Sequence, residues 1–118
     1  LGSAARKSVV EVGVQCHELG GIFIAAHVDR PAFSVFSQLG AIPPEAAFDA
    51  VELSRTANEE AWLPKVAAYA VTRSSDAHNL ADVARVWTEA PLQAFSVAAL
   101  REAFALHATS LSPRLTQF

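Results

Sequence analysis

The chain has 118 residues, the length of one modest domain, and its 52% hydrophobic content is enough to form a core without disulfide or metal support. Nine basic residues are scattered among twelve acidic ones, so we do not expect stable binding to duplex nucleic acid. The single cysteine, Cys16, cannot form an internal disulfide, which fits a reducing compartment. No apolar run approaches the roughly 20 residues needed to cross a bilayer. We therefore expect a soluble, cytoplasmic protein with no membrane partner.

Helical signals begin the chain and recur between its apolar runs. Ser8 and Glu11 have the spacing of a capping box, which predicts a helix over about 6–19. Three further helices are predicted: a short one from Pro31 to Gly40, one capped at Thr56 and shortened by Pro64, and one capped by Ser96.

The chain begins with Leu1 and contains no Met, so we expect a processed, trimmed or cloned fragment.

Four short apolar runs have the length and composition of strands. They cover residues 22–26, 50–54, 69–72 and 85–90. Helices that alternate with such strands predict an α/β fold with a mainly parallel sheet, either open or part of a barrel. A sheet of three or four strands would have two unpaired edges, and unpaired edges invite another strand. The chain therefore either lacks part of its fold or pairs with another subunit.

Metal-ligating side chains follow the first and third predicted strands. His27 comes directly after the run 22–26, and Asp76 and His78 follow the strand at 69–72. Residues two apart on an extended backbone project to the same side, and ligands collect at the carboxyl ends of parallel strands. Imidazole and carboxylate groups together suit Zn, Mn or Fe, which lower the pKa of bound water to about 7. Spacing alone leaves a second interpretation open, because Asp and His two residues apart also occur as loop caps or surface pairs.

Three segments together resemble the latter half of PHP (polymerase and histidinol phosphatase) domains. They are HELGGIFIAAHVDRP at 17–31, AVELS at 50–54 and SSDAH at 74–78. The resemblance spans about residues 8–104. It implies that residues 1–108 are the C-terminal portion of a PHP-like domain, followed by an irregular tail at 109–118. The implied fold is a distorted barrel of seven strands with alternating helices.

The resemblance also implies a function. PHP domains hold up to three metal ions that hydrolyse phosphate esters, and the matching motifs make His27, Asp76 and His78 metal ligands here. The family's other ligands lie in the first half of the domain, which this chain does not contain. We therefore predict little or no phosphoesterase activity from these 118 residues alone. The implied substrate is a phosphorylated small molecule or a nucleotide.

A non-catalytic interpretation competes with the enzyme. In it the chain is half of a barrel that assembles with itself or with the missing N-terminal half. A serine nucleophile is a weaker rival, because Ser74, Ser75 and His78 are too close in sequence to align as a triad and no nucleophile elbow is present. No nucleotide cofactor is implied, since no phosphate-cradling glycine loop joins a strand to a helix.

Two charged residues beside the motifs have open roles. Arg30 could bind the substrate phosphate with its planar guanidinium, or form a salt bridge to Asp29 or another neighbour. Arg55 and Arg73 are weaker candidates for the same phosphate contact. Glu52 lies inside a predicted strand, where its side chain could point to the carboxyl end of the sheet or to solvent. We favour a structural role for it.

Overall fold

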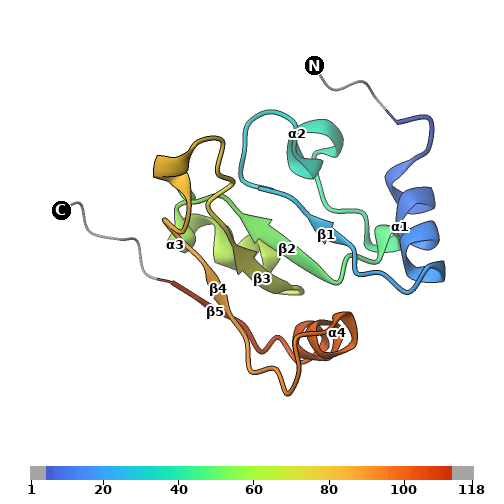
Figure 1. Cartoon of the computed structure of the whole chain (residues 1–118). Helices are drawn as coiled ribbons and strands as arrows, with labels where there is room; N and C mark the ends of the chain where they lie inside the picture. The colour runs from blue at the N-terminus through green and yellow to red at the C-terminus, as the bar shows by residue number, and fades with distance from the viewer. Residues whose placement is uncertain (1–4, 113–118) are drawn as a thin grey trace.

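The computed structural model describes residues 5–112 and contains a three-stranded parallel sheet (Figure 1). Its strands are β1 (Ile24–Ala25), β2 (Ala50–Leu53) and β3 (Ala70–Arg73), in the order β1-β2-β3. Val51 pairs with Ala25 on one side and with Val71 on the other, so β2 is the central strand. The predicted α/β class and parallel sheet are confirmed, whereas the described residues form an open sheet and not a barrel.

Helix α1 (Val9–Glu18) confirms the first capping box. Ser8 accepts a hydrogen bond from the Glu11 amide, and the Glu11 carboxylate accepts one from the Ser8 amide. Gly13 is buried where this helix meets the short 3-10 helix η1 (Pro44–Ala46). A Cβ at position 13 would lie 2.5 Å from the Ala46 carbonyl oxygen, so only glycine allows this close approach.

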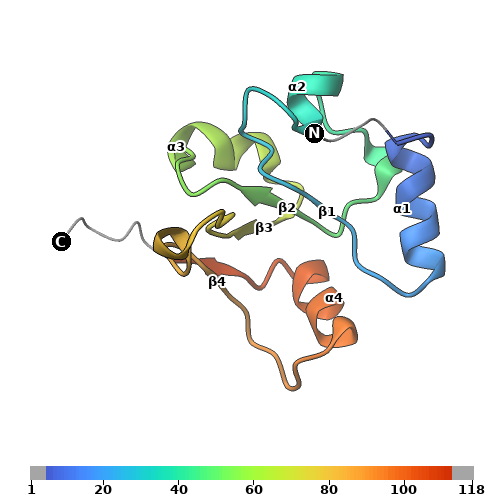
Figure 2. The same cartoon turned by 45° about the horizontal axis from the view of Figure 1, so that its top comes forward.

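The two faces of the sheet are covered by different helices, as Figure 2 shows. Val51 and Leu53 of β2 are fully buried against the side of α2 (Val35–Leu39), α3 (Glu59–Trp62) and the 3-10 helix η2 (Leu63–Val66). Ala50 and Ala70 point to the opposite face, where Phe104 of α4 (Val97–Ala105) packs on them. Alternating residues of β2 therefore contribute to two separate apolar clusters.

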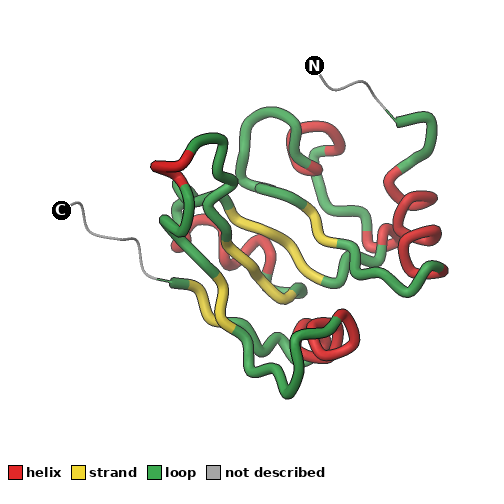
Figure 3. The backbone as a smooth tube through the Cα atoms, viewed as in Figure 1, coloured by secondary structure: helices red, strands yellow, loops and turns green. Residues whose placement is uncertain are grey.

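A second sheet corrects the predicted fourth strand. The strand expected at 85–90 is only β4 (Thr88–Glu89), and it pairs antiparallel with β5 (Ser110–Leu111) instead of joining the parallel sheet (Figure 3). Strand β5 lies within the tail that we expected to be irregular, while 113–118 lie outside the described residues.

This small sheet covers the outer edge of β3. The Thr88 hydroxyl accepts a hydrogen bond from the Arg73 amide and donates one to the Arg73 carbonyl, at 2.7 and 2.8 Å. The Thr109 hydroxyl donates to the Val71 carbonyl at 2.7 Å. Of the two edges expected to be unpaired, that of β3 is thus occupied by side chains, whereas β1 ends the sheet on the other side.

Local helix signals were right at some places and wrong at two. The short helix expected to begin at Pro31 begins only at Val35, because Ser34 caps it by accepting a hydrogen bond from the Ser37 amide. Gly40 ends α2 in the left-handed conformation, with φ 74°, and Ser96 caps α4, both as predicted. The capping box expected at Thr56 is wrong, because Asn58 caps α3 by accepting a hydrogen bond from the Ala61 amide. Within residues 5–112, no helix has the length and apolar character that a bilayer crossing requires.

Candidate functional site

The loops that follow β1 and β3 meet at the carboxyl end of the sheet. A guanidinium nitrogen of Arg30 lies 3.6 Å from a carboxylate oxygen of Asp76, and both side chains are partly exposed. Asp29 does not pair with Arg30. Its carboxylate accepts hydrogen bonds from the amide and the hydroxyl of Ser54, at 2.6 and 2.5 Å. The salt bridge considered for Arg30 is therefore formed with a candidate metal ligand.

His27 lies in the turn two residues after β1 and has a left-handed backbone, with φ 28°. Its amide donates a hydrogen bond of 3.1 Å to Oε1 of Glu52. Its ring Nδ1 is buried without a hydrogen-bond partner, the one such side-chain nitrogen or oxygen in the described residues. A buried polar atom normally has a partner, so the missing partner marks this nitrogen as a candidate ligand atom.

His78 is held in one orientation by the backbone of Asp76. Its Nδ1 lies 2.7 Å from the Asp76 carbonyl oxygen. A carbonyl only accepts, so Nδ1 carries the proton, and Nε2 of the neutral imidazole keeps its lone pair. Metal-binding histidines commonly have this arrangement, in which the ring N–H that faces away from the metal donates to a backbone carbonyl. Asp76, like His27, has a positive φ, of 47°.

The donor types therefore fit a divalent metal, but the three side chains do not form a complete metal site in this chain. In the part of the chain that is described, no group of three or more His, Cys, Asp or Glu side chains is arranged to hold a metal ion. His27, Asp76 and His78 lie at the same end of the sheet without converging on one point.

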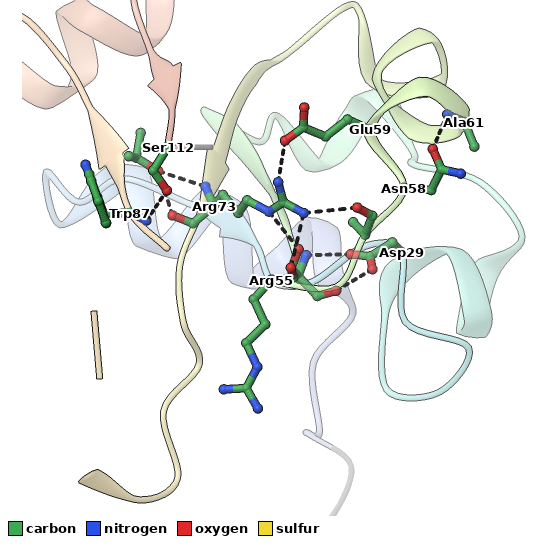
Figure 4. Close-up of polar contacts among 11 residues, drawn as sticks. Asp29, Arg55, Asn58, Glu59, Ala61, Arg73, Trp87 and Ser112 are labelled. Carbon is green, nitrogen blue, oxygen red and sulfur yellow. Dashed lines mark hydrogen bonds and ion pairs between the residues drawn. The ribbon is translucent and has the colours of Figure 1, made fainter. Parts of the chain in front are cut away.

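Arg73 is buried, and its guanidinium makes four hydrogen bonds (Figure 4). Its guanidinium donates to the carbonyls of Ser54, Arg55 and Ala57 at 3.1, 3.2 and 3.0 Å, and it also pairs with the carboxylate of Glu59. These contacts hold the loop between β2 and α3 against the end of β3. The weak expectation that Arg73 contacts a phosphate is wrong, because its donors point into the protein interior.

Arg55 fixes the loop that contains Asp76. Its Nη1 donates to the Ser75 carbonyl and pairs with Asp82 of the 3-10 helix η3 (Leu80–Asp82), both at 3.1 Å. The Ser75 hydroxyl is buried and bonded to the backbone of Arg85 and Val86. Ser75 is therefore engaged in the fold, which agrees with rejecting it as a nucleophile.

Comparison with known proteins adds one match. Residues 63–109 match the family model described as PHP-associated. The matched stretch includes Asp76 and His78, and it confirms the resemblance to the C-terminal part of a PHP domain; His27 and Arg30 lie outside it. No curated protein and no solved structure matches this chain.

Proposed function

We propose that this chain supplies part of the metal centre of a metal-dependent phosphoesterase, with His27, Asp76 and His78 as ligands. The observation that carries the proposal is the buried, unpartnered Nδ1 of His27 at the same end of the sheet as the free Nε2 of His78. Both His27 and Asp76 also have positive φ values. Such backbone conformations cost about 1–3 kcal/mol each, but Phe33, Ala47, Ala84 and His107 have them too, so they add no separate support.

The roles follow from the chemistry of each group. A bound Zn, Mn or Fe ion would act as a Lewis acid and lower the pKa of water to about 7. His27 and His78 would each offer one ring nitrogen, and Asp76 a carboxylate oxygen. Arg30 lies close enough to Asp76 to hold the phosphate of a sugar phosphate or nucleotide beside that ion. The remaining ligands would come from residues that this chain does not contain, so we expect the chain alone to be inactive.

The test uses the complete protein that contains these residues. Hydrolysis of a generic phosphate monoester is measured with added Mn²⁺ or Zn²⁺ for the wild type, His78→Asn and His107→Asn. His107 is an exposed histidine at the end of α4, so its variant is the matched control. We expect His78→Asn to lower kcat at least about a hundredfold and His107→Asn to leave it unchanged. Equal turnover in the two variants would contradict the assigned role of His78.

A second function is favoured by one specific observation, the position of β1 at the edge of the sheet. Side chains of Thr88 and Thr109 occupy the edge of β3, whereas within residues 5–112 the one strand that pairs with β1 is β2. In this alternative the chain is a non-catalytic module whose β1 pairs with a second copy or with an N-terminal half. The solution mass of the 118-residue chain tests it, because a strict monomer at high concentration argues against pairing with itself.

A further inference from the structure

One carboxylate joins the two loops that carry the candidate ligands. Glu52 is the third residue of the central strand β2 and lies on the same face as Ala50. Its Oε1 accepts the hydrogen bond from the His27 amide at 3.1 Å, and its Oε2 accepts one from the hydroxyl of Ser74. The first contact reaches the second residue after β1, and the second contact reaches the residue directly after β3, two positions before Asp76.

We propose that Glu52 is a positioning residue that holds His27 and the Ser74–Asp76 segment at a fixed separation on one rim. This inference rests on the proposed function, because the separation matters only if the two segments bind the same ligand. His27 has a left-handed backbone, and the amide that Glu52 accepts is part of that turn. The Val28 amide also donates to the Glu52 backbone carbonyl at 2.8 Å, so strand and side chain hold the turn together.

The reach of the side chain is essential to this role. Glu52 must span from the central strand to both neighbouring loops, and each of its oxygens already serves one of them. Gln keeps this reach: its carbonyl can accept from the His27 amide, and its NH₂ can donate to Ser74, whose hydroxyl also accepts. Asp keeps the charge but is one methylene shorter. The pair Glu52→Gln and Glu52→Asp therefore separates reach from charge.

Two measurements test the proposal. The first is the Mn²⁺ affinity of the complete protein by titration calorimetry, for the wild type, both variants, Glu52→Ala and the exposed control Glu60→Ala. We expect Glu52→Asp and Glu52→Ala to bind about tenfold more weakly, and Glu52→Gln and Glu60→Ala to stay within about threefold of the wild type. The second is hydrogen exchange of the His27 amide without metal, which should become about fivefold faster in Glu52→Ala and Glu52→Asp.

The outcomes separate this inference from the function it rests on. Unchanged affinity in Glu52→Ala overturns the positioning role, and so does an equal loss in Glu52→Gln and Glu52→Ala, because charge and not reach would then matter. If the wild type binds neither Mn²⁺ nor Zn²⁺, the proposed function fails. The His27 amide then still decides the contact, since unchanged exchange in Glu52→Asp contradicts it. Glu52→Gln and Glu52→Asp keep the test valid if Glu52→Ala does not fold.

Discussion

Two polar regions lie at the carboxyl ends of the strands, and they differ in how completely their side chains are bonded. Around Arg73 the guanidinium is 1% exposed, and three carbonyls and a carboxylate accept its hydrogen bonds. Around Asp76 the side chains are partly exposed and make few contacts, and the nearby His27 Nδ1 has none. The first region is a scaffold that fixes the loops, and the second keeps donor atoms available. The same end of the sheet thus holds one densely bonded polar cluster and one sparsely bonded cluster.

The largest expected effect on stability comes from removing the buried guanidinium. Arg73→Met keeps an unbranched apolar stem but removes the donors that bond the carbonyls of Ser54, Arg55 and Ala57. Because buried groups that lose a hydrogen bond cost about 1–3 kcal/mol, we expect the free energy of unfolding to fall by about 3 kcal/mol. Urea denaturation measures this change through the transition midpoint.

The same substitution at Arg55 is the matched control for Arg73. Arg55 is partly exposed and has two contacts at its guanidinium, with Ser75 and Asp82. Water can replace those contacts, so Arg55→Met should cost about 1 kcal/mol or less. Equal losses in the two variants would mean that burial does not distinguish the two regions, and the comparison would fail.

An intermediate effect is expected at Asp29, which ties the turn after β1 to the end of β2. Asp29→Ala removes the acceptor for both the amide and the hydroxyl of Ser54. Hydrogen bonds to a charged acceptor contribute about 1.5–3 kcal/mol, so the variant should lose about 2 kcal/mol in the same urea experiment. Asp29→Asn retains an acceptor for the amide and should lose less than half as much. If Asp29→Asn loses more than half of the free energy that Asp29→Ala loses, the charge of Asp29 matters more than its hydrogen bonds.

The parts of the fold that sequence predicted correctly are coded locally. The capping box at Ser8 and the glycine end at Gly40 depend on residues within one or two turns, and both are present. The alternation of apolar runs and helices gave the parallel sheet. Strand β5 was missed because its pairing with Thr88 joins distant segments, and a two-residue strand has no periodicity to detect.

The candidate site was predictable in composition but not in contacts. The motif residues His27, Asp76 and His78 do lie at one end of the sheet, because parallel strands place their carboxyl ends together. Whether a strand-end arginine points inward or outward depends on packing, so Arg73 could not be separated from Arg30 by sequence. The contacts of Glu52 with His27 and Ser74 span 25 and 22 positions of the sequence, and no local pattern encodes them.

The smallest expected effect on stability is at Asp76, where the comparison makes its sharpest claim. Asp76→Asn removes one charge from an exposed ion pair with Arg30, and Asn accepts the left-handed backbone as readily as Asp. Exposed ion pairs contribute about 0.2–1 kcal/mol. The free energy of unfolding, measured by urea denaturation, should therefore fall by less than about 0.5 kcal/mol. The carbonyl that orients His78 belongs to the backbone and is unchanged.

The same variant should nevertheless weaken Mn²⁺ binding by the complete protein about tenfold or more, because an amide oxygen is a poorer ligand than a carboxylate for such an ion. A residue that contributes almost nothing to folding and much to metal affinity belongs to a site and not to the scaffold. If Asp76→Asn destabilises the protein as much as Arg73→Met does, Asp76 is part of the scaffold. Its pairing with Arg30 then gives no support to the proposed metal site.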